Sequence, residues 1–272
     1  MRIRPEFDEY YVTNLNEYIN TIQTLFAEHK EIYFRGVNEA RFNLAPGMAR
    51  VGTKAPTVAV ENDFYLKSRT FINKALSHTE YTGTNTLADM EALAIAQHSG
   101  LRTRLLDWSL NPFTSLWFAC AGPKGPNADN YCVVWILIAP TNEDVRQTFF
   151  NKVKSLTGSL LDLTETLFYA PDNWDSRIKA QSGLFSIHHI DRTRGNFMPL
   201  DENELFFPHK FDTNHTFNSE THWNLIKILI NRDLYVRDIF ETLERFNVHW
   251  KTLFPDRDTA AAELNNDFIK HL

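Results

Sequence analysis

The sequence predicts a single domain of the α+β class. Runs typical of helices and runs typical of strands both occur along the 272 residues, and no internal repeat is visible. No linker or shift in composition marks a boundary between two domains. Hydrophobic residues make up 43% of the chain, which is enough to bury a sizeable core.

Composition excludes several classes of protein. The net charge of -6 argues against nucleic-acid binding by bulk electrostatics, although it leaves room for a local basic cleft. Cys120 and Cys132 are the only cysteines, so we expect two small buried side chains and no disulfide framework. Residues 1–14 lack the apolar core of a signal peptide, and no apolar run approaches the roughly 20 residues that cross a bilayer. We therefore expect a cytoplasmic protein.

The first predicted element is a helix that begins near Asn14. The Asn14 side chain can cap it, and Glu17 stands three residues later, which is the spacing of a capping box. The apolar residues that follow at helical spacing predict one buried face: Leu15, Tyr18, Ile19, Ile22, Leu25 and Phe26.

A short strand-type run, Glu31–Gly36, places Arg35 at its end, where Gly36 allows the backbone to turn. Such an arginine can hold a phosphate or a carboxylate because the guanidinium group offers two parallel donors. A surface arginine or an ordinary ion pair is the alternative. Residues 37–62 show no sustained periodicity, which predicts a loop long enough to act as a lid or binding segment.

An unusual density of polar and charged side chains lies between Gln97 and Trp108. A helix is expected over 63–78, and a second one ends at Gln97 and His98, with Gly100 at the position of a left-handed C-cap. A helix-end histidine that only stabilises the helix dipole is the simple alternative for His98.

Residues 103–108 predict a short strand. If Asp107 is buried it needs a partner, and we expect it to face Arg104 or Arg35. The next helix is expected to begin at Pro112 with Asn111 as its cap.

The second half of the chain is less regular. Residues 131–139 form a nearly continuous apolar run, which predicts a central strand. The remaining predicted elements are a helix over 142–156, strand-type runs around 172–177 and 181–185, strands over 205–211 and 225–230, an amphipathic helix over 233–246, a turn at 253–256 and a last short helix.

Several motifs follow one another in a characteristic order. They are Phe34-Arg35-Gly36, Ala96-Gln97-His98 with Gly100, Thr103, Leu105-Leu106-Asp107-Trp108, Asn111-Pro112, Arg177, Gln181, Gly183, Phe185 and Leu253-Phe254-Pro255-Asp256. Together they resemble the FRG domain family, which takes its name from the Phe-Arg-Gly motif. The resemblance implies an N-terminal helical segment over 1–30, an FRG-type domain over 31–262 and a C-terminal tail over 263–272.

The order of these segments is also similar to the ADP-ribosyltransferase fold, which implies a central mixed or split β-sheet flanked by helices. In that fold an arginine of an early strand anchors NAD and a late polar segment stabilises the transition state. The implied catalytic residues are Arg35, Gln97, His98, Asp107 and Gln181. The implied NAD-binding residues are Tyr33, Arg35, Gly36, Thr103, Arg104, Trp108, Ser109, Phe113 and Phe185.

By this analogy Arg35 binds the pyrophosphate or ribose, Trp108 or Phe113 stacks on the nicotinamide, and Thr103 and Ser109 orient the substrate. The strand around 181–185 carries no glutamate. Cleavage at the ribose anomeric carbon passes through an oxocarbenium-like state that a carboxylate stabilises. Three carboxylates are candidates for that role: Asp107, Glu202 and Glu204.

The predicted function is therefore that of an NAD-consuming, ADP-ribosyltransferase-like enzyme that modifies RNA or protein. NAD is the substrate, and neither a metal nor a membrane is expected. An unrestrained enzyme of this kind is toxic, so a toxin or antiviral-defence role with a neutralising antitoxin partner is the expected context.

Other classes stay open. A non-catalytic module that binds a nucleotide or a partner protein would use Arg35, Arg104 and Gln181 without an acid. A metal-dependent nuclease would use His98, Asp107, His188, His189 and Asp191, although their spacing is not that of a metal motif. A groove for single-stranded RNA would be lined by Arg102, Arg104, Trp108, Arg192, Arg194 and Phe197.

Overall fold

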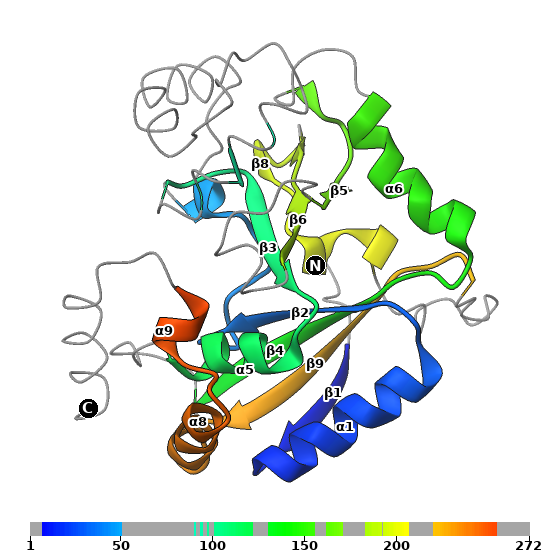
Figure 1. The fold of residues 1–272 in the computed structure, drawn as a ribbon. Helices are drawn as coiled ribbons and strands as arrows, with labels where there is room; N and C mark the ends of the chain where they lie inside the picture. Colours follow the sequence, from blue (N-terminus) through cyan, green and yellow to red (C-terminus); the bar gives the residue numbers. More distant parts are fainter. Residues whose placement is uncertain are drawn as a thin grey trace.

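The computed structural model describes residues 7–50, 90, 93–94, 97, 101–121, 130–155, 162–170, 183–191, 193–206 and 220–254 (Figure 1). Seven strands form one mixed sheet in the order β1-β9-β4-β2-β3-β6-β5, in which β1 is parallel to β9 and the other neighbours are antiparallel. Their bounds are β1 Asp8–Val12, β2 Ile32–Val37, β3 Leu105–Ser109, β4 Tyr131–Ile138, β5 Leu167–Tyr169, β6 Gly183–Ile187 and β9 Asn224–Asn231. The predicted α+β class and mixed sheet are confirmed.

Helices and short turns surround the sheet, and a two-stranded ribbon stands beside it. The helices are α1 Leu15–Glu28, α5 Pro112–Ala121, α6 Glu143–Ser155, α8 Val236–Arg245 and α9 Trp250–Leu253. The 3-10 turns are η1 Gly47–Arg50, η3 Leu200–Glu202 and η4 Glu204–Phe206, and the ribbon pairs β7 Ile190–Asp191 with β8 Asn196–Phe197. No helix in the described parts of the chain combines the length and apolarity needed to cross a bilayer.

The sheet is nearly divided between β2 and β3. The two strands share one registered pair, Phe34 with Ser109, whereas β2 and β4 share six pairs and β3 and β6 share five. Two sub-sheets, β1-β9-β4-β2 and β3-β6-β5, therefore meet at a seam. The backbone groups that the two strands do not exchange there must find other partners.

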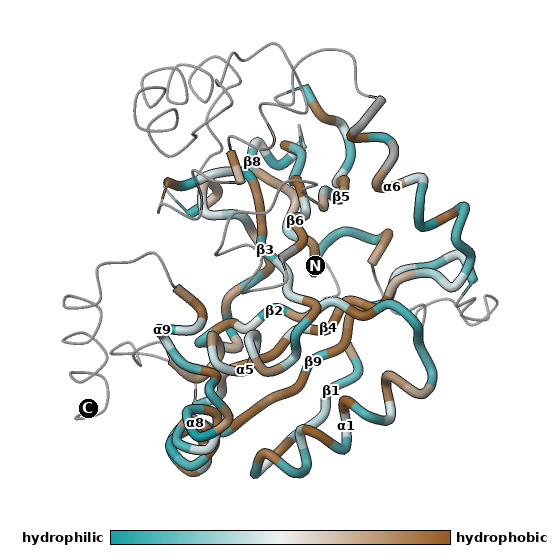
Figure 2. Tube along the Cα trace, viewed as in Figure 1, coloured by the Kyte–Doolittle hydropathy of each residue, from teal (hydrophilic) through white to brown (hydrophobic). Residues whose placement is uncertain are grey.

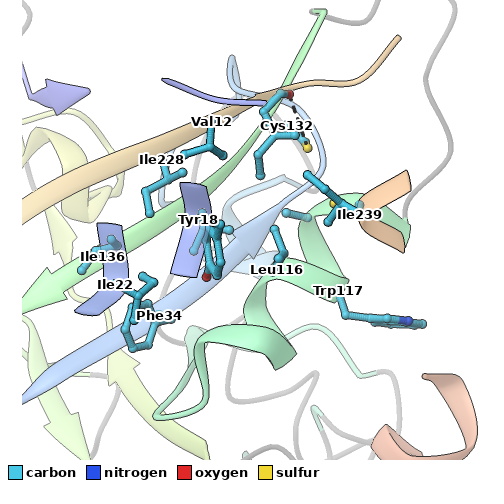
Figure 3. Close-up of a cluster of buried hydrophobic side chains, with 14 of the residues drawn as sticks. Val12, Tyr18, Ile22, Phe34, Leu116, Trp117, Cys132, Ile136, Ile228 and Ile239 are labelled. Atoms are coloured by element: carbon cyan, nitrogen blue, oxygen red, sulfur yellow. Dashed lines mark hydrogen bonds between the residues drawn. The ribbon is translucent and has the colours of Figure 1, made fainter. Parts of the chain in front are cut away.

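One face of the larger sub-sheet is covered by α1, α5 and α8 (Figure 1). Figure 3 shows Tyr18 and Ile22 of α1 and Leu116 of α5 packed on side chains of the sheet. Figure 2 shows β9 as largely hydrophobic, whereas α1 and α8 alternate in hydropathy, which suits helices with one buried face. Cys120 and Cys132 are free thiols buried in this core, as expected.

The opposite face packs against loop 38–50, α6 and the turns η3 and η4. Its centre is aromatic: the rings of Phe168 and Trp223 are stacked with centroids 4.6 Å apart. Trp135 and Phe206 belong to the same cluster. The same cluster contains Tyr33 of β2 and Leu106 and Trp108 of β3, so the core on this face continues across the seam.

Most predicted elements are found within a few residues of their expected bounds. Asn14 caps α1 by accepting a hydrogen bond from the Glu17 amide at 3.0 Å, and the side chain of Glu17 accepts from the Thr13 amide rather than from Asn14. Asn111 caps α5 through the amides of Phe113 and Thr114. The elements expected at 63–78, 172–177 and beyond residue 254 lie outside the described residues.

One predicted strand is wrong, and one observed strand was not predicted. The strand expected over 205–211 is wrong at its start, because Asn203 accepts a hydrogen bond from the Leu205 amide and the chain forms the turn η4. Strand β1 was not expected, because Tyr10 and Tyr11 are exposed and the segment has no apolar alternation. Its pairing with β9 builds the N-terminal segment into the main sheet.

Candidate functional site

The seam between β2 and β3 is closed by a side chain instead of by the backbone ladder. Nη1 of Arg35 lies 2.7 Å from the backbone oxygen of Asp107 and 2.8 Å from its carboxylate Oδ1. Asp107 stands two residues before Ser109, the residue at which the two strands are paired. The guanidinium group of Arg35 thus takes the place of missing inter-strand hydrogen bonds.

A second donor reaches the same carboxylate from another segment. Nε2 of Gln97, a residue with helical backbone, lies 3.2 Å from Oδ1 of Asp107. The hydroxyl of Thr103 donates to the other end of the Gln97 amide and accepts from the Leu105 amide at 3.1 Å. Because the ion-paired Asp107 carboxylate can only accept, the Gln97 amide turns its nitrogen to Asp107 and its oxygen to the Thr103 hydroxyl.

The ion pair is open on the side of the carboxylate. The side chain of Asp107 is 43% exposed, whereas that of Arg35 is 15% exposed. Nε of Arg35 is buried and has no hydrogen-bond acceptor among the described residues. A buried donor of this kind calls for an acceptor that the described chain does not supply, such as water or a ligand.

Further positive charge surrounds the pair. Partial burial and the neighbouring Arg35 lower the pKa of Arg50, Asp107 opposes this shift, and Arg102 adds to it. Turn η1, which carries Arg50, is tied to this region by a 3.0 Å hydrogen bond from the Met48 amide to the Thr103 oxygen. Three arginines thus share the surroundings of the Asp107 carboxylate, which favours an anionic ligand.

The glycine of the Phe-Arg-Gly motif has a packing role. A Cβ atom on Gly36 would lie 1.9 Å from the Ser115 oxygen and 2.6 Å from the Ala119 nitrogen, both in the backbone of α5. Phe34 is fully buried between the sheet and the helices. In the motif, therefore, Phe34 and Gly36 seat β2 against the core and α5, and Arg35 alone points to the seam.

Two predicted ligand-binding residues, Tyr33 and Arg104, are held away from the seam. Tyr33 is buried, and its hydroxyl donates to Glu31 at 2.9 Å. Arg104 is fully buried, with Nη1 3.5 Å from the His188 oxygen and its guanidinium 5.4 Å from the centroid of the Phe197 ring.

The predicted aromatic contacts are also directed into the core. Trp108 is 2% exposed and donates from Nε1 to Ser186 at 3.0 Å. Phe185 is fully buried, and the ring of Phe113 lies 6.5 Å from that of Tyr18. Ser109 is buried and accepts from the Asn111 amide at 3.0 Å, so its hydroxyl helps to start α5.

His98 and Gln181 lie outside the described residues, as does Arg192. Gly183, two residues after Gln181 in the sequence, pairs with Ser109 at the start of β6. Of the predicted catalytic residues, the structure brings together Arg35, Gln97 and Asp107.

The described residues of the nuclease alternative do not converge on a metal site, and His98 lies outside the described residues. Nε2 of His188 lies 3.1 Å from the Ser186 hydroxyl, and its Nδ1 lies 2.8 Å from the Met198 oxygen, so both ring nitrogens have partners. Burial lowers the pKa of His188 to about 4. Among the residues that the structure covers, no three His, Cys, Asp or Glu side chains are placed to hold a metal ion.

Residues 30–128 match the model of the FRG domain family. The chain contains an FRG domain. This confirms the resemblance for the motifs from Phe34 to Pro112, and the matched range includes Arg35, Gln97 and Asp107. The motifs from Arg177 onward lie beyond the matched range. The chain matches no curated protein and no solved structure significantly.

Within the FRG domain, sequence reasoning missed the contribution of Arg50. The signal that pointed to it was weak: residues 37–62 were predicted to be a loop long enough to bind a ligand, without any residue of the loop being selected. Arg50 enters the site only because η1 packs beside Arg102 and Thr103.

Proposed function

We propose that this FRG-domain protein binds NAD as a substrate at the seam between β2 and β3 and transfers ADP-ribose to a macromolecule. One observation carries the proposal: Arg35 and Gln97, which come from separate segments, both donate to one oxygen of the half-exposed Asp107 carboxylate. A fixed carboxylate beside an arginine cluster suits a substrate with both a pyrophosphate and a cleavable glycosidic bond.

The residues have complementary roles in this reaction. Arg35, with Arg50 and Arg102 nearby, supplies positive charge for the pyrophosphate. The bond between the ribose C1′ and the nicotinamide nitrogen breaks, and its electron pair leaves with neutral nicotinamide. A nucleophilic atom of the acceptor bonds to C1′ and loses its proton to solvent. Asp107 stabilises the positive charge that develops on the ribose, and the two donors on Oδ1 hold it in place.

The order of the strands supports the same proposal. Strands β2, β3 and β6 are neighbours in the sheet, and Phe34, Ser109 and Gly183 lie in one row across them. The three segments that the resemblance to ADP-ribosyltransferases implicates, around Arg35, around Asp107 and after Gln181, therefore belong to adjacent strands.

The test is to incubate the purified full-length chain with NAD labelled in its adenylate phosphate and with separate RNA and protein fractions. Released nicotinamide and label transferred to a fraction are measured. We expect turnover by the wild type, loss of at least about 100-fold with Asp107→Asn, and a comparable loss with Arg35→Gln. Arg237→Gln is the matched control. This substitution removes the same charge as Arg35→Gln, and the Arg237 side chain on α8 is 89% exposed and lies outside the proposed site.

Thermal unfolding of each variant separates a lost site from a lost fold. Absence of nicotinamide release by the folded wild type, or release that Arg35→Gln leaves unchanged, would overturn the proposal. The cluster of three arginines near Asp107 also suits a module that binds nucleotides without turnover. Saturable binding of NAD without nicotinamide release would favour that second function.

A further inference from the structure

Loop 38–50 carries a stack of arginine and aromatic side chains next to the seam. The guanidinium carbons of Arg41 and Arg50 lie 5.4 Å and 5.8 Å from the centroid of the Phe42 ring. Phe42 is partly buried against the aromatic core of the sheet, and this packing holds its ring in place. Guanidinium and phenyl groups in contact form flat surfaces of the kind on which nucleobases stack.

The loop is held in place at several points. The Leu44 amide donates to Oδ1 of Asp201 at 2.7 Å, and the Leu44 oxygen accepts from the Leu200 amide at 3.0 Å. Arg232 donates to the oxygen of Asn38 at the start of the loop. These bonds come from outside the FRG domain match, so the loop is a fixed platform that the rest of the chain orients.

The platform continues to the seam through Arg102. A Cβ atom on Gly47 would lie 3.8 Å from the Cα atom of Arg102, so the loop backbone packs directly on this residue. Arg102 and Arg50 are both exposed, and each lies close enough to influence the other electrostatically. The platform therefore offers successive positive charges that lead from the molecular surface to Arg35.

The local charge favours a polyanion although the whole chain carries a net charge of -6. Four arginines, at positions 35, 41, 50 and 102, face two carboxylates: Asp107 pairs with Arg35, and Glu39 pairs with Arg41 at 2.6 Å. Among the described residues of this surface, the arginines therefore outnumber the carboxylates. An acidic peptide would satisfy only this charge. A nucleic-acid strand provides phosphates for the arginines and also flat bases that can stack on the guanidinium and phenyl planes.

The described residues predicted to line an RNA groove do not share one exposed surface. Arg104, Trp108 and Phe197 are buried, and Arg194 pairs with Asp191 and Glu202. Of that predicted set, Arg102 is described as an exposed side chain next to the seam.

We propose that loop 38–50 together with Arg102 is the docking surface for single-stranded RNA, which is the acceptor of the transferred ADP-ribose. The acceptor role rests on the proposed function, whereas the binding of RNA does not. Single-stranded RNA fits because its unpaired bases stack on aromatic and guanidinium planes while its phosphates pair with arginine.

The test measures the fluorescence anisotropy of a labelled single-stranded RNA oligonucleotide of mixed sequence with the full chain, without NAD. Arg50→Gln combined with Arg102→Gln is expected to weaken binding at least about tenfold and to reduce the slope of log K against log salt by about 1.4, since two phosphate contacts are lost. Phe42→Leu keeps an apolar side chain and is expected to weaken binding by about tenfold through lost stacking. Arg237→Gln, on α8, serves as the charge-matched control and is expected to bind as the wild type does.

Equal binding by all these variants would overturn the proposal, as would binding to a single-stranded DNA of the same sequence with none to RNA. Because NAD is absent, RNA binding is measured independently of turnover. Label transferred to protein, with no RNA bound, would leave the proposed function standing and remove RNA as the acceptor. RNA binding without any NAD turnover would keep the docking surface and reject the transfer.

Discussion

The two sides of strand β3 are built on opposite plans. On the β2 side the strands share one pair, and the gap holds charged side chains, Arg35 and Asp107, with the carboxylate 43% exposed. On the β6 side the strands share five pairs. There Trp108 donates to Ser186, Ser186 donates to His188 Nε2, and His188 donates from Nδ1 to the Met198 oxygen.

The difference separates scaffold from site. The chain of hydrogen bonds on the β6 side is buried, neutral and closed, so it fixes the register of the strands and leaves nothing for a ligand. The β2 side is open, charged and incompletely satisfied, because Nε of Arg35 has no acceptor in the described parts of the chain. Polar groups that fold-level packing does not satisfy are the ones that remain for chemistry.

The largest expected effect on the free energy of unfolding comes from Gly36→Ala. Because β2 has little pairing with β3, it depends on close packing with α5, and the added Cβ would overlap the backbone of that helix at 1.9 Å. We expect a loss of more than about 3 kcal/mol in the free energy of unfolding, or failure to fold. Urea denaturation gives the measurement.

Gly47→Ala is the matched control for this substitution. Its Cβ would meet its nearest neighbour, Arg102, at 3.8 Å, so we expect a change below about 1 kcal/mol. Equal stability of the two variants would contradict the close approach of β2 and α5.

The β6 side of β3 is tested by His188→Leu, which leaves the Ser186 hydroxyl and the Met198 oxygen without their partner. We expect a loss of about 2 to 3 kcal/mol at neutral pH, measured by urea denaturation. In the wild type, burial lowers the pKa of His188 from 6.5 to about 4. The unfolded chain therefore binds a proton at higher pH than the folded one, and stability is lost as the pH falls from 6.5 towards 4.

This loss is on the order of 3 kcal/mol for the wild type. The His188→Leu variant should lack this component of the pH dependence. His222→Gln, a variant of a histidine outside the buried chain, should keep the wild-type profile. The same pH dependence in wild type and His188→Leu would show that the closed side does not depend on a neutral histidine.

Asp201→Asn tests the hydrogen bond that holds loop 38–50. This substitution is expected to raise the free energy of unfolding, whereas Gly36→Ala and His188→Leu lower it. Burial, and less strongly Glu202, raise the pKa of Asp201 to about 6, while its hydrogen bond from Leu44 and the charge of Lys227 act in the other direction. The folded chain holds the proton up to higher pH than the unfolded one, so this group reduces stability as the pH rises from about 4 to 6. Asparagine keeps an oxygen for the Leu44 amide without the charge.

We therefore expect Asp201→Asn to be more stable than the wild type at pH 8 by about 1 to 2 kcal/mol, and equal to it near pH 4. Urea denaturation at both pH values makes the comparison. A variant less stable than the wild type at pH 8 would show that the loop needs the charged form of Asp201.

The smallest effect on stability is expected for the ion pair between Arg35 and Asp107 on the β2 side of β3. A double-mutant cycle with Arg35→Gln and Asp107→Asn should give a coupling of about 1 kcal/mol or less, because solvent screens the half-exposed carboxylate. Unfolding in urea of the two single variants and the double variant supplies the values. A coupling above about 3 kcal/mol would make the seam a structural element like the β6 side and would weaken the case for a site.

Local sequence was a good guide where a residue acts on its own segment. Asn14 and Asn111 were predicted as helix caps because their side chains accept hydrogen bonds from amides two or three residues away. Strand β4 was predicted because its own residues form a continuous apolar run. Strand β1 escaped prediction because its conformation depends on β9, near the other end of the chain. The chemistry of five residues such as Asp8–Val12 does not indicate such a partner.

The sequence by itself predicted that Asp107 faces an arginine, and it offered both Arg104 and Arg35 as that partner. Only the tertiary structure decided between the two arginines. The sheet places β2 next to β3, so Arg35 reaches Asp107. Arg104 extends instead towards the His188 oxygen on the β6 side. It also turned Trp108 into the core beside Asp107, because consecutive residues of a strand point to opposite faces. Which face is core and which neighbour is a partner depends on contacts between distant segments, and no local pattern contains them.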